Sequence, residues 1–400
     1  MTRICILGGG FGGLYTALNL SRLPWAVMPE IILVDKSDRF LFTPFLYELV
    51  TAELQEWEVA PTFAELLVDT GIRFVQGLVT KIDFETKQVE VNIGQRDVIT
   101  YDRLVLAIGG ETPMDVVDGV SEYAIPFRNL HDFHRLNSKL ELLEASNRDK
   151  IRVCIAGAGS SGVELACKVA DRLKVRTQDR GRVRLVDRHD KILTNSTTAN
   201  RTIAELALSQ RGVWTDLNTS VSQVSHDEIT LKYAEGGDTL PVDVVLWTVG
   251  NTFSKMLQNL PVEHNHRGAI ATELTLQVKR YTDVFAIGDL AGCVNSDGQL
   301  LPATAQVAFQ QSQYCAWNIW ASLNQKALVN FNYIPLGEFI SLGQDGATAS
   351  IFGKFNIDGF PAHVMRRVAY LLRMPTFEHQ LKVGTHWLTK PLFEILRKSI

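Results

Sequence analysis

The fold is decided by two similar stretches of sequence, and the first reads Ile4-Cys-Ile-Leu-Gly8-Gly-Gly10-Phe-Gly-Gly13. An apolar run that leads directly into closely spaced glycines is typical of a buried parallel strand followed by a tight turn. A helix is expected over residues 12–23, and a second apolar strand over residues 31–34 ends at Asp35. This order of strand, glycine-rich turn, helix and strand predicts a dinucleotide-binding unit.

The three glycines of this turn have separate roles in such a unit. Gly8 permits the tight turn, Gly10 lets the backbone approach a pyrophosphate, and Gly13 lets the helix and the strand pack closely. The pyrophosphate is expected on the unpaired N–H groups at the start of the helix, and Asp35 is expected to accept a hydrogen bond from a ribose hydroxyl. The first unit is therefore a candidate cofactor site.

A second copy of the pattern begins at residue 151. Its parts are a strand at residues 151–155, a turn with Gly157, Gly159 and Gly162, a helix at residues 163–173, and a strand at residues 183–186 that ends at Asp187. One such glycine pattern can be purely structural, whereas two complete copies favour binding of two dinucleotides, or of one beside a degenerate copy. The charge of Asp187 would repel the 2′-phosphate of NADPH and so favours NADH, although Arg188 beside it offers that phosphate a partner.

Length and composition indicate a chain that folds throughout. Four hundred residues predict two or three domains, and 46% hydrophobic and 21% charged residues are ordinary globular usage. Forty basic and 44 acidic side chains give a net charge of −4, which does not indicate a nucleic-acid partner. No apolar run has the length of a spanning helix, and Met1 leads almost directly into the first strand. We therefore expect a chain made in the cytosol without a secretory signal.

The cysteines favour a reducing compartment, because their number is odd and no two form a C-x-x-C pair. The five are Cys5, Cys154, Cys167, Cys293 and Cys315. The first three fall in expected strands and an expected helix, where buried structural thiols are anticipated. His131 and His134 are expected on one helix surface, and because further ligands are not evident, no metal site is predicted.

Three further segments extend the pattern. Residues 281–287 are expected to form a strand that breaks at Gly288-Asp289, and residues 101–109 and 244–250 each end a β-like run at a glycine. With the paired glycine turns, Phe285-Ala-Ile-Gly-Asp289 resembles the flavoproteins with two dinucleotide-binding domains. The resemblance implies an α/β fold of tandem Rossmann-like domains, in which residues 101–109 and 244–250 are crossover strands between the domains.

That resemblance also implies which residues bind each cofactor. FAD would be held by the first unit, through Gly8, Gly10, Gly13, Asp35 and Asp289, with weaker contacts from Lys36 and Ala107. NADH, or alternatively NADPH, would be held by the second unit, through Gly157, Gly159, Gly162, Glu164, Asp187 and Gly250. The expected domains are residues 1–112 with 268–330 for FAD, residues 113–267 for NAD(P)H, and residues 331–400 as a C-terminal amphipathic helical region for membrane association or dimerisation.

The electron acceptor is indicated by residues 305–310, Ala-Gln-Val-Ala-Phe-Gln, on a helix that Pro302 is expected to open. This sequence resembles the Ala-Gln-x-Ala-x-Gln motif of the type II NAD(P)H:quinone oxidoreductases, which do not pump protons. The resemblance implies that Gln306 and Gln310 border the flavin and a lipid quinone, whereas their spacing alone favours a polar helix face in water. Disulfide reductases and sulfide-oxidising quinone reductases of this fold need a cysteine pair, which is not evident here.

Two segments and one acid refine the resemblance. Residues 42–49 and 56–61 are similar to the cyanobacterial and plastid branch, which is associated with reduction of plastoquinone and of naphthoquinone precursors in phylloquinone synthesis. Glu164 matches an acid of the family placed between the nicotinamide and quinone sites. It is either a proton relay, if burial raises its pKa, or a first-turn residue that complements the helix dipole.

The last part of the chain concentrates positive charge, with seven basic and three acidic residues in residues 357–400. Two apolar helical stripes are expected, one of Val364, Val368, Leu371 and Leu372 beside Arg366, Arg367 and Arg373, and one of Leu381, Leu388, Leu392, Ile395 and Leu396. Trp387 is expected at a lipid interface. The pattern predicts an in-plane amphipathic helix pair on anionic lipid, with a homodimer interface or core helix as the alternative.

Together these features predict a peripheral flavoenzyme on the cytoplasmic face of a membrane, either a cytoplasmic or a thylakoid membrane. It would transfer hydride from NAD(P)H to FAD and two electrons to a lipid quinone, either plastoquinone or a naphthoquinone. Glu164, Gln306 and Gln310 are its catalytic candidates. The alternatives are a flavoprotein reductase of a small soluble redox protein and a nucleotide-binding redox sensor without turnover.

Overall fold

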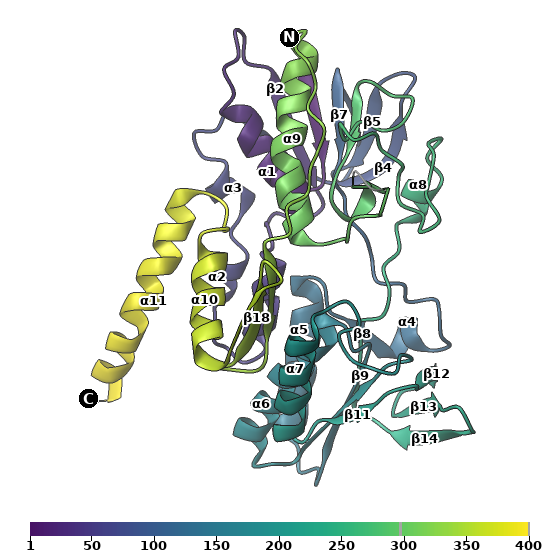
Figure 1. The fold of residues 1–400 in the computed structure, drawn as a ribbon, viewed down its shortest axis with the longest axis vertical. Coiled ribbons are helices and arrows are strands. Elements are labelled where there is room, and N and C mark those ends of the chain that lie inside the picture. The colour runs from purple at the N-terminus through teal and green to yellow at the C-terminus, as the bar shows by residue number, and fades with distance from the viewer. Residues whose placement is uncertain (296–297, 399–400) are drawn as a thin grey trace. The chain divides into compact units, whose positions relative to one another are not determined.

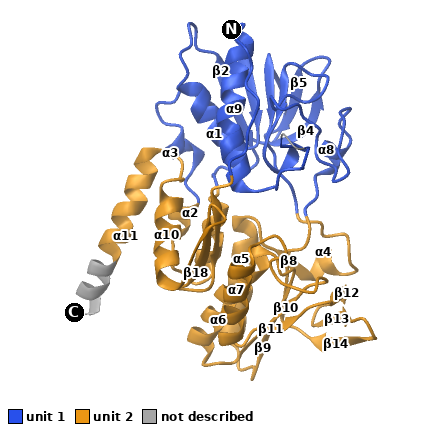
Figure 2. Cartoon of the chain, viewed as in Figure 1, with its two compact units in different colours: residues 1–40, 60–111, 251–334 blue, residues 41–59, 112–250, 335–400 orange. Residues whose placement is uncertain are grey.

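The computed structural model describes residues 1–295 and 298–398, with side chains described as far as residue 390. The chain divides into two compact units, coloured separately in Figure 2. Unit 1 comprises residues 1–40, 60–111 and 251–334, and unit 2 comprises residues 41–59, 112–250 and 335–400. Residues 41–59 group with the second unit and residues 251–267 with the first. The assignment of one cofactor to each expected domain stays a prediction.

Unit 1 is built on a parallel sheet of five strands in the order β16-β7-β1-β2-β3. The strands are β1 (Arg3–Leu7), β2 (Glu30–Asp35), β3 (Arg73–Gln76), β7 (Arg103–Leu106) and β16 (Val284–Ala286). Helix α1 (Phe11–Ser21) joins β1 to β2 and packs against α9 (Ala305–Leu323), beside which it is drawn in Figure 1. The predicted strand, turn, helix and strand are confirmed.

The rest of unit 1 corrects two expected boundaries. Its other elements are an antiparallel sheet of β4 (Leu78–Asp83), β5 (Gln88–Asn92) and β6 (Arg96–Thr100), helices α3 (Phe63–Leu66) and α8 (Lys255–Gln258), and the 3-10 turn η2 (Gly288–Leu290). The strand before Gly288 is shorter than residues 281–287, because Tyr281 N donates to the Val278 carbonyl in a turn. Helix α9 begins after Pro302, because the Thr304 side chain caps it by accepting a hydrogen bond from Val307 N.

Unit 2 repeats the arrangement with a parallel sheet in the order β11-β10-β9-β15-β8. Its strands are β8 (Ala124–Pro126), β9 (Ile151–Ala156), β10 (Gly181–Val186), β11 (Trp214–Asp216) and β15 (Val244–Trp247). The other elements are α4 (Val120–Tyr123), α5 (Leu130–Glu144), α6 (Ser160–Thr177), α7 (Thr198–Gln210) and an antiparallel sheet of β12 (Ser220–Val224), β13 (Glu228–Lys232) and β14 (Gly237–Pro241). Helix α6 joins β9 to β10, as α1 joins β1 to β2.

Two further segments complete unit 2. Residues near the N-terminus supply the 3-10 helix η1 (Thr43–Leu49) and α2 (Glu56–Val59). The C-terminal part supplies an antiparallel sheet of β17 (Gly337–Ser341), β18 (Ala347–Ile351) and β19 (Phe355–Asp358), then α10 (Gly359–Leu371) and α11 (Phe377–Lys398). The two helices confirm the expected helix pair, whereas the sheet was not predicted.

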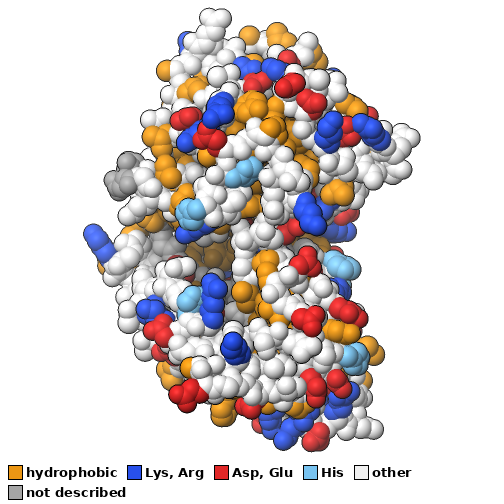
Figure 3. Space-filling view, turned by 90° about the vertical axis from the view of Figure 1, so that its right-hand side faces the viewer, with side chains coloured by type: hydrophobic (Ala, Val, Ile, Leu, Met, Phe, Trp, Pro, Cys, Tyr) orange, Lys and Arg blue, Asp and Glu red, His pale blue; other side chains and the backbone are white. Residues whose placement is uncertain are grey.

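The surface agrees with the small net charge. Basic and acidic side chains are mixed over the face shown in Figure 3. No helix in the described part of the chain has the length and apolar character needed to cross a membrane.

Candidate functional site

The first glycine-rich turn lies at the end of β1 in unit 1. Gly8 has a φ of +99°, and a Cβ at this position would lie 2.3 Å from the carbonyl oxygen of Ala107. A Cβ at Gly13 would lie 1.8 Å from the Gly8 carbonyl oxygen, so glycine is needed for α1 to pack on the turn. A Cβ at Gly10 would meet no atom within 4 Å, which leaves room for a ligand to approach the backbone.

The start of α1 differs from that of several other helices in its capping. Helices α5, α7 and α9 are capped by the side chains of Asn129, Thr197 and Thr304, whereas α1 begins at Gly10 without a side-chain cap. Uncapped N–H groups at a helix start form a binding site for anions such as a pyrophosphate. The turn therefore fits the predicted dinucleotide.

Asp35 holds this turn to the end of β2. Its Oδ2 accepts a hydrogen bond from Gly9 N at 2.6 Å, and its Oδ1 accepts one from Ser37 N at 2.8 Å. Burial raises the pKa of Asp35, and these two hydrogen bonds act in the opposite direction. Lys36 is exposed beside it, and Ala107 is buried against the turn.

Unit 2 repeats the same geometry at the end of β9. Gly157 has a φ of +102°, a Cβ at Gly162 would lie 1.7 Å from the Gly157 carbonyl oxygen, and a Cβ at Gly159 would meet nothing within 4 Å. Helix α6 also begins without a side-chain cap. Asp187 takes the place of Asp35, because its Oδ2 accepts a hydrogen bond from Ala158 N at 2.6 Å and its Oδ1 accepts one from His189 N at 2.8 Å.

The Asp187 carboxylate has one contact without a counterpart in unit 1. The Nδ1 atom of His189 lies 2.6 Å from Asp187 Oδ1.

Gly250, at the end of the β15 segment, has a φ of +81° and packs against Pro113. The second turn therefore fits a dinucleotide as well as the first does.

The Gly288-Asp289 motif forms η2 in unit 1 and is tied to α9. Gly288 N donates a hydrogen bond to Gln311 Oε1 at 2.7 Å, and Asp289 is half-buried in the same turn. Gln311 is buried, and the analysis of the sequence missed it. Its four-residue spacing from Val307 and Cys315, which are also buried, was a signal that position 311 faces the interior.

Gln306 and Gln310 lie on one face of α9 and are both partly buried. Gln306 Oε1 accepts a hydrogen bond from the Tyr333 hydroxyl at 2.8 Å. Gln310 Nε2 donates to the Ile334 carbonyl at 2.8 Å, and its Oε1 accepts from Ile334 N at 3.0 Å. Both side chains are hydrogen-bonded to residues 333–334 while remaining partly exposed. Their contact with a quinone stays a prediction.

Glu164 lies in unit 2, on α6, and its side chain is buried. Since α6 begins at Ser160 and has no acidic residue in its first turn, the helix-dipole interpretation is wrong. Glu164 Oε1 accepts a hydrogen bond from Ser341 N at 2.7 Å, and Arg366 Nη2 lies 3.7 Å from the same oxygen. Burial raises the pKa of Glu164 to about 7, against the lowering effect of Arg366. Such a carboxyl group exchanges protons near neutral pH.

The three thiols predicted to be buried and the two histidines predicted on one helix surface lie where the sequence predicts them. All five cysteines are free and buried, and burial raises the pKa of Cys5, Cys154 and Cys167 to about 12. His131 and His134 are both exposed on α5. No cluster of three residues suited to hold a metal occurs in the described part of the chain.

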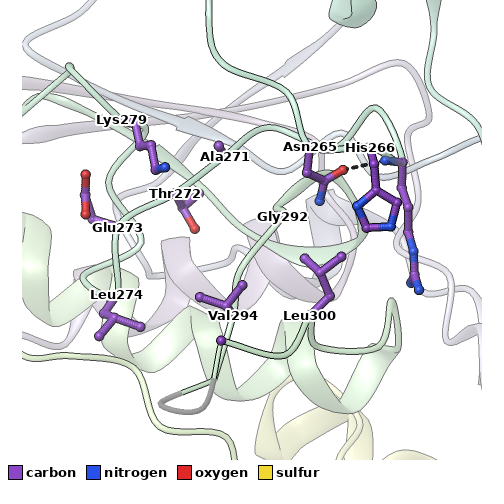
Figure 4. A pocket seen from close by; sticks show the side chains of 12 residues that line it. Asn265, His266, Ala271, Thr272, Glu273, Leu274, Lys279, Gly292, Val294 and Leu300 are labelled. Atoms are coloured by element: carbon purple, nitrogen blue, oxygen red, sulfur yellow. Dashed lines mark hydrogen bonds between the residues drawn. The ribbon is translucent and has the colours of Figure 1, made fainter.

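A separate cavity of about 680 Å³ lies in unit 1 (Figure 4). Thr272, Lys279, Val294 and Leu300 are among its lining residues, and Asn265 in its wall accepts a hydrogen bond from Arg267 N. The predicted cofactor and quinone residues are not among the described residues that line this cavity.

The two sheets and their paired turns define an oxidoreductase fold with two dinucleotide-binding domains. Comparison with solved structures agrees with this class. NDH2 from Plasmodium falciparum, solved in complex with NADH, has a TM-score of 0.86 over 98% of both chains at 16% identity. The sulfide:quinone oxidoreductase of Aquifex aeolicus has a TM-score of 0.77 over 93% of this chain and 91% of its own, at 19% identity.

The family model of the pyridine nucleotide-disulphide oxidoreductases matches residues 2–312. A demethylphylloquinone reductase, NdbB of Synechocystis, is 49% identical over 99% of this chain and 98% of its own. The alternative NAD(P)H-ubiquinone oxidoreductase C1 of Arabidopsis thaliana is 40% identical over 97% of this chain and 80% of its own. The chain belongs to the pyridine nucleotide-disulphide oxidoreductase family, as a type II NAD(P)H:quinone oxidoreductase of the cyanobacterial-like branch. The predicted family is confirmed.

Proposed function

We propose that the chain is an FAD-dependent enzyme that transfers hydride from NAD(P)H to FAD and two electrons to a membrane quinone, without pumping protons. One observation carries the proposal: the same uncapped glycine turn, held by the same pair of aspartate hydrogen bonds, occurs twice in a chain of this family. The name of the Synechocystis relative, a demethylphylloquinone reductase, supports a naphthoquinone as the acceptor. Plastoquinone is the second acceptor to test.

The first turn is proposed to hold FAD and the second to hold the nicotinamide dinucleotide. In unit 1, Gly8, Gly10 and Gly13 would admit the pyrophosphate, Asp35 would face the ribose, and Asp289 would bind the ribitol chain. When bound, FAD supplies the two-electron chemistry, so the chain itself has to bind and orient the reactants. NADH is proposed as the preferred donor, because Asp187 is placed to read the ribose hydroxyl.

The C-terminal region of unit 2 is proposed to lie on the surface of an anionic bilayer, on its cytoplasmic face. Its exposed large apolar side chains are Phe352, Phe355, Phe360, Val364, Val368, Leu372, Phe377, Leu381 and Leu388. Three of them on α10 and Leu372, its C-cap, recur every fourth residue and make one continuous apolar stripe. Exposed Lys354 lies between the two phenylalanines at the tip of the β18–β19 hairpin, where its charge complements anionic lipid.

Steady-state turnover of the purified full-length protein tests the proposed function. NADH and NADPH are each supplied with a soluble naphthoquinone or a soluble benzoquinone, and the flavin released by denaturation is identified by chromatography. We expect FAD, oxidation of NADH faster than that of NADPH, and reduction of the naphthoquinone. Protein that carries FAD but reduces neither quinone would contradict the proposal.

A further inference from the structure

Unit 2 contains a buried group of charged side chains contributed by three separate elements. Glu48 of η1 and Lys168 of α6 are fully buried, Arg366 of α10 is 1% exposed, and Glu164 of α6 is 7% exposed. Glu53, which follows η1, completes the group with 11% of its side chain exposed. Burying a charged side chain costs free energy unless an opposite charge is close to it. A buried carboxyl group without such a partner is therefore the one that becomes neutral by keeping its proton.

Arg366 is held by Glu48 rather than by Glu164. Its Nη1 forms a short ion pair with Glu48 Oε1, and its Nη2 donates to the Pro44 carbonyl at 2.5 Å. The guanidinium carbon lies 5.3 Å from the ring centre of Phe45 and 5.0 Å from that of Tyr370. These contacts fix the guanidinium, and they leave its Nη2 3.7 Å from Glu164 Oε1, which is beyond hydrogen-bond range.

Lys168 completes the pairing on the other side of Glu48. Its ammonium group forms a short ion pair with Glu53 and lies 3.8 Å from Glu48 Oε1. Arg367, a quarter exposed, lies 3.7 Å from Glu53. The two short ion pairs of the group are therefore made by Glu48 and Glu53, whereas Glu164 has only the 3.7 Å contact with Arg366.

The remaining titratable groups around Glu164 do not change this result. Tyr47 is a buried phenol and Tyr370 a partly buried one, and desolvation raises the pKa of Tyr370 to about 12. Burial and the nearby Arg367, Lys168 and Arg366 lower the pKa of His363 to about 4, which leaves it neutral. Glu48 raises the pKa of Glu164, whereas Arg366 and Lys168 lower it.

We propose that Glu48 is a positioning residue that withholds Arg366 from Glu164, so that Glu164 carries the proton that enters from water during quinone reduction. This inference rests on the proposed function. In that reaction NADH, one proton and the quinone give NAD⁺ and the quinol, so the hydride supplies two electrons and one proton, and one further proton comes from water. Protonated Glu164 gives up that proton, becomes a carboxylate, and is protonated again from water.

Two substitutions test the proposal because they act in opposite directions. Glu48→Gln removes a negative charge and releases Arg366 to pair with Glu164, so the pKa of Glu164 falls. Lys168→Met removes a positive charge and leaves the Glu48–Arg366 pair in place, so the pKa of Glu164 rises. A role of these residues in stability alone would not give shifts of opposite sign.

The pKa of Glu164 is measured in the resting protein by following carboxylic acid bands in the infrared spectrum as the pH is changed. The band of Glu164 is identified as the one that is missing in Glu164→Gln. We expect its midpoint to move down by at least one pH unit in Glu48→Gln and up in Lys168→Met. The pH above which kcat for quinone reduction falls should shift in the same direction as the titration midpoint of Glu164. Glu144→Gln is the matched control, because this largely buried carboxylate of α5 pairs with Arg172 of α6, the helix that carries Glu164.

The proposal is overturned if both substitutions leave the midpoint where it is in the wild type, or shift it as Glu144→Gln does. A wild-type protein that reduces no quinone would contradict the proposed function instead, and the infrared titration would still report on the pairing. Thermal unfolding of each variant identifies one that does not fold. If Glu48→Gln does not fold, the proposal is tested by whether the pKa of Glu164 rises in Lys168→Met.

Discussion

Arg366 of α10 and Glu48 of η1 form an ion pair in the interior of unit 2, although 318 positions separate them in the chain. Helix α10 is therefore anchored in the folded core of this unit. Arg366 was predicted to lie beside a lipid-facing stripe, and that prediction is wrong for this residue. Arg366 is buried because Glu48, Pro44 and two aromatic rings surround its guanidinium group.

Loss of Arg366 should destabilise the protein strongly. Removing one partner of a buried ion pair leaves the other charge uncompensated and costs about 3 to 5 kcal/mol. Arg366→Leu should therefore lower the free energy of unfolding by that amount in a denaturant titration. Arg73→Leu is the control, since Arg73 is largely exposed and its partner Glu30 keeps Arg3. An exposed pair of this kind is worth at most about 1 kcal/mol. Equal losses in the two variants would contradict the argument.

The glycine turns could be predicted from sequence because their requirements are local. A φ of +99° at Gly8 and the close approach of Gly13 depend on residues within one strand, turn and helix. The pairing of Arg366 with Glu48 depends on segments far apart in the chain, and neither residue has a local pattern that indicates it. The same is true of the contact of Trp387, whose Nε1 donates to Glu58 at 2.7 Å, and its position at a lipid interface stays a prediction.

The C-terminal sheet could have been found. Residues 344–346, Gln-Asp-Gly, and residues 353–354, Gly-Lys, are turn sequences at the two ends of β18, and Gly353 has a φ of +66°. Residues 331–400 were predicted as a helical region because of the apolar helical stripes that follow this sheet. The stripe positions Leu392, Ile395 and Leu396 lie outside the residues whose side chains the structure describes.

Asp289 should be required for flavin retention. The turn η2 places its carboxylate beside Gly288, and the proposed ribitol hydrogen bonds to a charged group are worth roughly 1.5 to 3 kcal/mol each. Asp289→Ala should therefore lose FAD on dilution, as measured by the flavin absorbance of the protein after gel filtration. Asp283→Ala is the control, because Asp283 pairs with Lys87 instead. Full flavin content in Asp289→Ala would contradict the assignment.

Asp187 should set the preference for NADH over NADPH. Its carboxylate is fixed by Ala158 N and His189 N at the end of β10, where it would repel a 2′-phosphate. Asp187→Ser should raise kcat/KM for NADPH relative to NADH, by about tenfold if the repulsion is worth about 1.4 kcal/mol. Asp190→Ser, three residues further on and exposed, serves as the control. An unchanged ratio in Asp187→Ser means that this residue does not read the ribose.

Glu164 should make the stability of the protein depend on pH. Its pKa is raised from 4.5 to about 7, so the folded state binds the proton more tightly than the unfolded state does. Stability is therefore lost as the pH rises between these two values, by up to about 3 kcal/mol, and is constant above them. The difference in unfolding free energy between wild type and Glu164→Gln should fall over this range. Glu205→Gln, at an exposed position of α7, should show no such trend; a flat difference for Glu164→Gln would contradict the shift.

Membrane binding should depend on the exposed apolar side chains of α10, its C-cap and α11, and replacing two of them should leave the fold intact. Leu372 and Leu388 are 67% and 78% exposed, and burying each in lipid is worth roughly 1.5 to 3 kcal/mol. Leu372→Glu with Leu388→Glu should therefore release the folded protein from anionic vesicles in a flotation assay, while turnover with a soluble quinone continues. Leu142→Glu, at a 75% exposed position of α5, should leave vesicle binding unchanged. If the double variant still floats with the vesicles but changes from dimer to monomer in sedimentation, these side chains form an interface between two copies of the chain instead.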